Sequence, residues 1–212
     1  MNKENIKIGF DLDGVILDNT TFKVEKYKEV YNIEFEDWQV SSNMIDEYVP
    51  DREMRRKIGN LAAARNFTKI LDDKSIELFK KLNEEGYELY IVSRRGKSDE
   101  GQKAARESIK QQNLEKYFKE IFLCETENKK VETIINNGIQ IFIDDRIEIV
   151  ESLYKKIHLP LLFDNFELIE KDLLKTKYPV KKVSNFINIG REIDEYGKLY
   201  KKNRGSNTEE SI

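Results

Sequence analysis

The chain has 212 residues, of which 39% are hydrophobic and 36% charged, with a formal net charge of −3. This composition predicts a globular fold with a charged surface. The near balance of acids and bases disfavours a nucleic-acid partner, and the absence of a long apolar run disfavours a membrane protein. A single cysteine, Cys124, rules out an internal disulfide, and no signal sequence precedes the first strand, so we expect a cytoplasmic protein.

The first predicted strand, residues 6–10, ends at two carboxylates, Asp11 and Asp13, which Gly14 follows. Alternate side chains of an extended segment point the same way, so both carboxylates would face one point beyond the strand. Gly14 permits a sharp turn there. Neighbouring acids repel each other unless a cation or a shared proton lies between them. The pattern therefore indicates a functional site at the end of the first strand.

A polar segment from residue 20 to 73 is mostly helical in pattern and too long for an ordinary loop, which predicts a small helical insert. We expect a cap domain at 19–73, a core domain built from 1–18 and 74–200, and a frayed tail at 201–212. Trp38 and Phe67 are interpreted as part of the hydrophobic core of the insert, with stacking on a nucleotide base as the alternative.

From residue 74 onward, predicted helices alternate with short apolar strands. Strands are expected at 89–92, 121–124, 139–143 and 159–163, and helices at 74–85, 99–112, 129–136 and 147–156. This alternation predicts a parallel sheet covered on both faces, which is a doubly wound, Rossmann-like α/β fold. The segment 165–201 is predicted to be helical, with a break at Tyr178 and Pro179.

Three of these strands end in polar side chains. Asp11 and Asp13 follow the first strand, Ser93 follows the second, and Asp144 and Asp145 follow the fourth. Ligands of open α/β sheets bind beyond the carboxyl ends of the strands, so these groups are expected to converge. An all-oxygen set of acids favours Mg²⁺, which shares its coordination shell with water and substrate phosphate. The sequence thus predicts Mg²⁺-dependent phosphoryl chemistry.

Together these residues resemble the four ordered motifs of the haloacid dehalogenase (HAD) superfamily. The motifs are Asp11-Leu12-Asp13-Gly14-Val15, Ser93, a lysine at 129 or 130, and Asp144-Asp145, and the resemblance spans residues 6 to about 164. It implies that Asp11 is a nucleophile that forms an aspartyl-phosphate. It also implies that Asp13 first donates a proton to the leaving oxygen and then accepts one from water.

The resemblance assigns the metal site to the acids. Asp144 would bind Mg²⁺ together with Asp11 and the main-chain carbonyl of Asp13, and Asp145 would be a second ligand or orient a water on the metal. Ser93 would bind the transferring phosphoryl group.

Basic residues would complete the phosphate site. Lys129 or Lys130 would screen the phosphoryl charge, with Lys129 slightly preferred. Arg94, beside Ser93, is a further candidate for phosphate binding. The insert lies where the smaller type of cap is found in the resembled superfamily, and such a cap reads the leaving group. Arg65 in this insert is the candidate for substrate contact.

These residues lead to the prediction of a Mg²⁺-dependent phosphatase acting on a small phosphorylated substrate. A 5′-nucleotide is favoured because Ile143–Arg146 and Ser93–Arg95 are similar to nucleotidase and polynucleotide-phosphatase branches. The alternatives are a phosphomutase, a nucleic-acid 3′-end phosphatase, and a non-catalytic binding or regulatory protein on the same fold. A 2-haloacid dehalogenase is disfavoured because its chemistry uses neither Asp13 nor a metal. The only histidine, His158, argues against a histidine-based zinc site, and the oligomeric state is not predicted.

Overall fold

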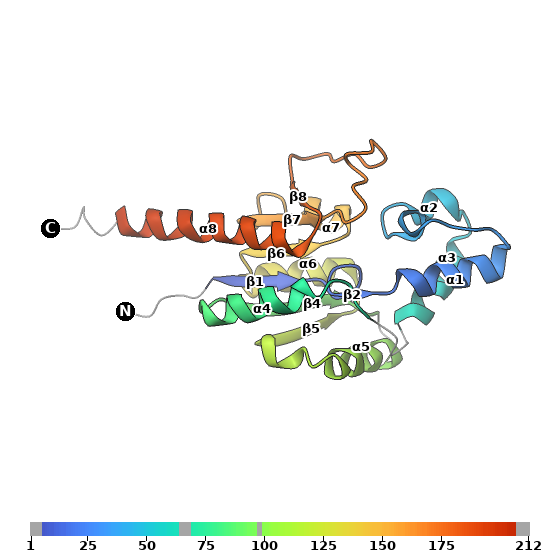
Figure 1. The fold of residues 1–212 in the computed structure, drawn as a ribbon, viewed down its shortest axis with the longest axis horizontal. Helices are drawn as coiled ribbons and strands as arrows, with labels where there is room; N and C mark the ends of the chain where they lie inside the picture. The colour runs from blue at the N-terminus through green and yellow to red at the C-terminus, as the bar shows by residue number, and fades with distance from the viewer. Residues whose placement is uncertain (1–5, 64–68, 97–98, 207–212) are drawn as a thin grey trace.

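A computed structural model describes residues 6–63, 69–96 and 99–206 of the protein. A parallel sheet lies between two layers of helices, and a helical insert lies beyond one end of the sheet (Figure 1). The sheet has the order β5-β4-β1-β6-β7-β8, and all neighbouring pairs are parallel. Its strands are β1 (Lys7–Phe10), β4 (Glu88–Arg94), β5 (Glu120–Cys124), β6 (Ile141–Asp144), β7 (Leu159–Phe163) and β8 (Lys181–Val183). The doubly wound α/β prediction is confirmed.

Helices cover both faces of the sheet. They are α4 (Lys74–Glu84), α5 (Asp99–Gln111), α6 (Glu127–Asn136), α7 (Ile147–Leu153) and α8 (Phe186–Ser206), with a short 3₁₀ turn at Glu115–Tyr117. Phe10 of β1 packs with Phe79 of α4 in the larger hydrophobic cluster, on the face that α4, α5 and α8 cover. Phe142 of β6 packs with Ile134 and Leu153 under α6 and α7. Strands buried on both faces explain the nearly continuous apolar runs in the sequence.

The segment 165–201 departs from the predicted helix. Residues 165–180 are loop and turn, β8 follows at Lys181–Val183, and α8 begins only at Phe186. Both lysines of β8 are exposed, as is common on an edge strand, so the apolar pattern that reveals a strand is missing. α8 continues to Ser206, into the stretch 201–212 that was predicted as a frayed tail, and residues 207–212 lie outside the described part.

The insert contains α1 (Thr20–Tyr31), a 3₁₀ turn (Asp37–Val40), α2 (Ile45–Tyr48) and α3 (Arg52–Ala63). It has a small hydrophobic cluster of its own, built on Tyr27, Val40, Val49 and Ile58. Trp38 packs edge-to-face on Tyr48, with ring centroids 5.4 Å apart, whereas Phe67 lies outside the described residues. Trp38 therefore packs within the insert.

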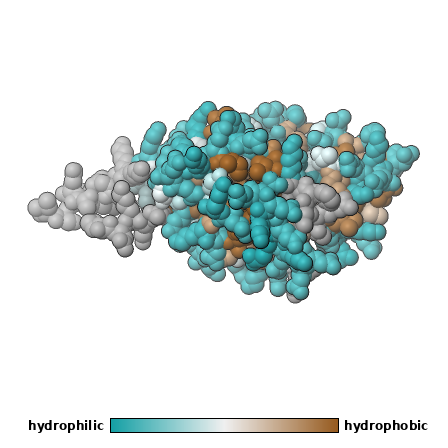
Figure 2. Space-filling model, turned by 60° about the horizontal axis from the view of Figure 1, so that its bottom comes forward, coloured by the Kyte–Doolittle hydropathy of each residue, from teal (hydrophilic) through white to brown (hydrophobic). Residues whose placement is uncertain are grey.

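A two-stranded antiparallel ribbon, β2 (Leu17–Asp18) and β3 (Lys69–Ile70), joins the insert to the core. Strands of two residues carry no periodic pattern, so the sequence did not predict them. The face of the molecule shown in Figure 2 is mostly hydrophilic. None of the helices in the described ranges combines the length and apolar character that crossing a membrane requires.

Candidate active site

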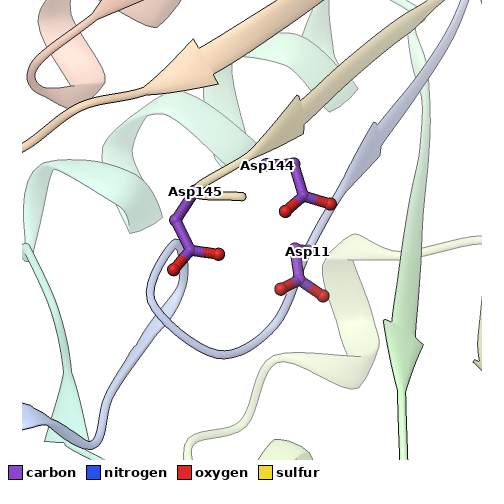
Figure 3. Close-up of side chains that lie close together, drawn as sticks. All are labelled: Asp11, Asp144 and Asp145. Carbon is purple, nitrogen blue, oxygen red and sulfur yellow. The ribbon is translucent and has the colours of Figure 1, made fainter. Parts of the chain in front are cut away.

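Three carboxylates meet at the carboxyl ends of two neighbouring strands. Asp11 follows β1 directly, Asp144 is the last residue of β6, and Asp145 comes next. Because β1 pairs with β6, one oxygen of each carboxylate lies within 4.8 Å of the others. The three side chains lie close together beyond the strand ends (Figure 3). Asp11 and Asp144 are buried and Asp145 is half-buried, so their mutual repulsion is poorly screened by water.

Lys130 supplies the positive charge at this cluster. Its Nζ lies 2.8 Å from Asp11 Oδ1 and 2.7 Å from Asp144 Oδ2, and its side chain is 2% exposed. Burial alone would lower the pKa of Lys130, but the two carboxylates outweigh burial and raise it. Burial also raises the pKa of Asp144 and of Asp145, and Asp11 adds to both shifts. Lys130 thus pairs directly with two of the three carboxylates, Asp11 and Asp144.

Of the two candidate lysines, the structure brings Lys130 to the acidic cluster and not the slightly preferred Lys129. Both residues lie near the start of α6, but Lys130 and Ile134 form its buried side. Lys129 points to solvent, where its Nζ pairs with Glu132 at 2.7 Å. The spacing of four residues between Lys130 and Ile134 puts them on one helix face, a signal that was already present in the sequence.

The turn after β1 brings the chain against the acidic cluster. Gly14 has φ +79°, and its N–H donates to the carbonyl of Leu17 at 2.9 Å. A Cβ added at Gly14 would lie 2.6 Å from Asp145 Oδ2. A side chain at this position would therefore clash with the carboxylate as well as strain the backbone.

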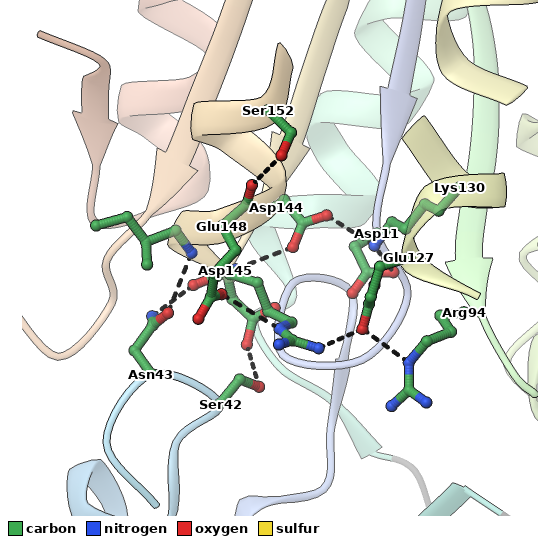
Figure 4. A network of polar contacts seen from close by, with 12 residues as sticks. Asp11, Ser42, Asn43, Arg94, Glu127, Lys130, Asp144, Asp145, Glu148 and Ser152 are labelled. Atoms are coloured by element: carbon green, nitrogen blue, oxygen red, sulfur yellow. Dashed lines mark hydrogen bonds and ion pairs between the residues drawn. The ribbon is translucent and has the colours of Figure 1, made fainter. Parts of the chain in front are cut away.

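Asp13, in the same turn, is held by an arginine that was not among the predicted site residues. Arg95 Nη2 lies 2.7 Å from Asp13 Oδ2, and the arginine side chain is 2% exposed. The other oxygen, Oδ1, is buried and accepts no hydrogen bond from the described residues. Arg94 also lines the pocket, but it is half-exposed and pairs with Glu127 at 2.9 Å rather than with Asp13 (Figure 4). Side chains alternate along a strand, so Ser93 and Arg95 share a direction that Arg94 does not.

Ser93 lies near the end of β4, 2% exposed, and lines the same pocket as Asp11 and Asp13. The structure thus brings Asp11, Asp13, Ser93, Lys130 and Asp145 to one pocket. Asp144 is fully buried and does not line the pocket itself; its Oδ2 pairs with Lys130 Nζ. Arg65, the predicted substrate contact, lies outside the described residues.

A loop of the insert docks on the acidic cluster (Figure 4). Ser42 Oγ donates to Asp145 Oδ2 at 2.9 Å. Asn43 Nδ2 donates to the main-chain carbonyl of Asp145 at 2.7 Å, and Asn43 Oδ1 accepts from the N–H of Ile147 at 3.1 Å. The side-chain amide of Asn43 therefore joins the insert to the backbone on both sides of Arg146.

Replacing Asn43 with alanine should destabilise the protein by about 1–2 kcal/mol, because one carbonyl and one N–H lose their partners in a half-buried site. Urea unfolding at neutral pH measures the change. Asn60→Ala is the matched control, since no hydrogen bond of the Asn60 side chain is found among the described residues, and it should leave the unfolding midpoint nearly unchanged. Equal midpoints for the two variants would contradict the docking role of Asn43.

The pocket lies between the strand ends and the insert. Its walls are formed by Asp11, Asp13, Asn19, Lys23, Ser42, Arg55, Arg56, Gly59, Asn60, Ser93, Arg94, Arg95, Gly96, Glu127, Lys130, Asp145 and Arg146. None of these residues is aromatic or aliphatic. The wall is therefore suited to a small, charged ligand rather than to an apolar one.

The acidic cluster fits a divalent metal ion. Its donors are all carboxylate oxygens, which Mg²⁺ and Ca²⁺ prefer to nitrogen or sulfur ligands. Burial and mutual repulsion already raise the pKa of Asp144 and Asp145, and a bound cation would relieve both effects. Asp11, Asp144 and Asp145 are the residues that would hold it.

Solved structures with the same fold are hydrolases of the HAD superfamily and related proteins. The Mycobacterium tuberculosis protein tyrosine kinase A matches with a TM-score of 0.64 and 12% identity over 90% of this chain and 99% of its own. The candidate HAD-type hydrolase YfnB from Bacillus subtilis, bound to magnesium, matches with a TM-score of 0.54 and 13% identity. The match covers 88% of this chain and 97% of YfnB. A candidate phosphatase from Clostridium difficile matches with a TM-score of 0.52 and 16% identity, over 81% of this chain and 100% of its own.

Dehalogenases are also among the matched structures. No protein-family model matches the sequence. No curated protein matches it either. At these identities the likeness concerns the fold, and it confirms the HAD-type fold that the motif resemblance implied.

Proposed function

We propose that the protein is a Mg²⁺-dependent phosphatase that hydrolyses a small phosphomonoester through an aspartyl-phosphate at Asp11. The observation that carries this proposal is the meeting of Asp11, Asp144 and Asp145 beside Lys130, with Asp13 at the same pocket. Residues 19–73 act as a cap over the core domain in this proposal. Mg²⁺ held by Asp11, Asp144 and the main-chain carbonyl of Asp13, with Asp145 as a ligand or through water, would screen the phosphoryl charge.

In the first step, a carboxylate oxygen of Asp11 attacks phosphorus, and the bond between phosphorus and the leaving oxygen breaks. Asp13 donates a proton to that oxygen through Oδ1, since Arg95 holds Oδ2. Lys130 stabilises the negative charge beside Asp11. Ser93, at the end of β4, binds the phosphoryl group.

In the second step, Asp13 accepts a proton from a water molecule as that water attacks phosphorus. The bond between Asp11 and phosphorus breaks, which releases phosphate and restores the carboxylate. Asp13 thereby regains the proton that it donated in the first step.

Asp13 favours a phosphatase over a dehalogenase among the chemistries of this fold. Halide leaves carbon as an anion and needs no proton, whereas an alkoxide leaving group does. A site that fixes one oxygen of Asp13 with Arg95 and leaves the other without a partner among the described residues suits proton transfer.

A 5′-nucleotide is the substrate favoured by the sequence motifs. The described pocket wall contributes polar and charged groups but no aromatic ring, so recognition of a nucleotide there would use its phosphate and sugar hydroxyls. A screen of nucleoside monophosphates, sugar phosphates and a 3′-phosphate oligonucleotide tests the substrate class and the alternative of a nucleic-acid end phosphatase.

Removal of divalent metal should abolish the activity. Treatment with a chelator is expected to reduce hydrolysis of p-nitrophenyl phosphate to background, because three carboxylates without a cation repel the anionic substrate. Addition of Mg²⁺ in excess should restore it. Full activity in the chelator would remove the metal from the mechanism.

A further inference from the structure

We propose that Lys23 and Arg56 form a second anion-binding subsite on the insert side of the pocket, and that the substrate carries a second anionic group besides its phosphate. The proposal rests on the phosphatase function proposed above and narrows its substrate class. The expected class is a compact phosphorylated metabolite with a carboxylate or a second phosphate.

Among the described residues, the acids that line the pocket lie on its core side. The acidic residues that line it, Asp11, Asp13, Glu127 and Asp145, all belong to the core. Among the described residues of the insert, the charged ones that line it are Lys23, Arg55 and Arg56, which are all cations. A phosphoryl group seated at the strand ends therefore faces a positive wall across the pocket.

Most cations of the pocket are already neutralised. Five of them have acidic partners: Lys130, Arg95, Arg94, Arg146 and Arg55. Arg55, for example, pairs with Asp46 at 2.8 Å and also donates to the carbonyl of Val49. Lys23 and Arg56 have no ion-pair partner among the residues that the structure describes. Burial and Asp11 raise the pKa of Asp145 and Lys23 lowers it, so Lys23 acts on the cluster from a distance; neither Lys23 nor Arg56 is held in an ion pair by a described residue, and both can contact a ligand.

Lys23 and Arg56 come from different helices of the insert. Lys23, on α1, is half-buried and also lines a small hollow next to Gly14 and Asp145, which places it near the acidic cluster. Arg56, on α3, is exposed. Two cations on separate helices, facing one cavity, can bind a single anionic group from two directions.

The surface of α3 leaves room beside Arg56. Gly59 and Asn60 follow at spacings of three and four residues, so they lie on the same helix face and line the pocket with it. A Cβ built on Gly59 would meet no atom within 4 Å. The glycine therefore leaves open space next to the guanidinium, and Asn60 offers a neutral donor and acceptor at its edge.

The charged side chains of the pocket wall favour a ligand with a second anionic group. An uncharged leaving group would leave Lys23 and Arg56 without an anionic partner, and no aromatic side chain of the described wall offers a stacking surface. A carboxylate or phosphate on the leaving group pairs with both cations. Charge-assisted hydrogen bonds of this kind correspond to roughly 10–100-fold in affinity.

Matched substrate pairs test the subsite. Kinetics with Mg²⁺ would compare 3-phosphoglycerate with glycerol 3-phosphate, and a nucleoside 3′,5′-bisphosphate with the 5′-monophosphate. In the pair that the protein accepts, the member with the second anion should have a kcat/KM roughly 10–100-fold higher, mainly through KM. Arg56→Gln should reduce this ratio by at least about 10-fold. Glutamine is a good helix former, so α3 should persist.

Lys57→Gln is the control, since Lys57 is an exposed neighbour on α3 that does not line the pocket. It should leave the ratio unchanged. A preference for the member without the second anion, or equal loss in both variants, overturns the subsite while leaving the phosphatase intact. If no phosphate ester is hydrolysed, the proposed function fails, and binding of the same compounds is measured by thermal shift instead. The subsite is supported if the compounds with two anionic groups stabilise the protein and Arg56→Gln removes this stabilisation. The subsite is overturned if these compounds do not stabilise the protein.

Discussion

Replacing Asp11 with asparagine is expected to reduce hydrolysis of p-nitrophenyl phosphate by roughly 10⁴-fold or more, with the fold intact. The amide oxygen of asparagine is a poor nucleophile, so the variant lacks the proposed attacking group. The neighbouring acids already have partners: Asp144 is fully buried and pairs with Lys130, Asp13 pairs with Arg95, and Asp145 accepts a hydrogen bond from Ser42. The variant also removes one of three repelling acids, so it should unfold at the same temperature as the wild type or higher in the absence of metal.

Asp13→Asn is the matched control for this prediction. p-Nitrophenolate leaves without help from an acid, so this variant should still transfer the phosphoryl group to Asp11 but release it slowly. Intact-mass spectrometry should then detect a phosphorylated protein for Asp13→Asn and none for Asp11→Asn. Normal turnover by Asp11→Asn would show that another residue is the nucleophile.

The fold was predictable because the chain is locally consistent with it. Strands buried on both faces are runs of apolar residues, and the helices between them have apolar stripes, so five of the six strands of the sheet were predicted within about two residues. The sixth, β8, has two exposed lysines and one buried valine, which no pattern distinguishes from a loop. Asp11, Asp144 and Asp145 were predictable for a related reason, since their positions follow from the ends of parallel strands.

The remaining parts of the site depend on contacts that sequence spacing does not encode. Asn43 is 102 residues from Asp145, and the packing of the insert on the core alone brings them together. Arg95 lies just past the end of β4, where alternation becomes unreliable, although its position two residues after Ser93 was a usable signal. Lys130 is a different case. Its spacing of four residues from Ile134 already placed it on the buried face of the helix. A lysine on an apolar face is rarely predicted to be buried, however, because burying a charge is costly unless it is paired.

A buried lysine is the feature of the site with the largest expected effect on stability. Lys130→Met, which keeps the shape and removes the charge, should destabilise the metal-free protein by about 3–5 kcal/mol because it leaves Asp11 and Asp144 without their cation. In a chain of this size the loss corresponds to a fall in Tm of roughly 6–20 °C. Lys129→Met removes the same charge from an exposed neighbour and should leave Tm unchanged.

Two further measurements connect this loss to the carboxylates. Burial and repulsion raise the pKa of Asp144 and Asp145, so the folded Lys130→Met variant binds protons at pH values where the unfolded chain does not. Its stability should therefore rise as the pH falls from neutral, and more than that of the wild type. Mg²⁺ should also raise the Tm of Lys130→Met more than that of Lys129→Met, since the ion supplies the missing charge. Equal Tm values for the two variants, at neutral pH without metal, would mean that Lys130 does not neutralise the acidic cluster.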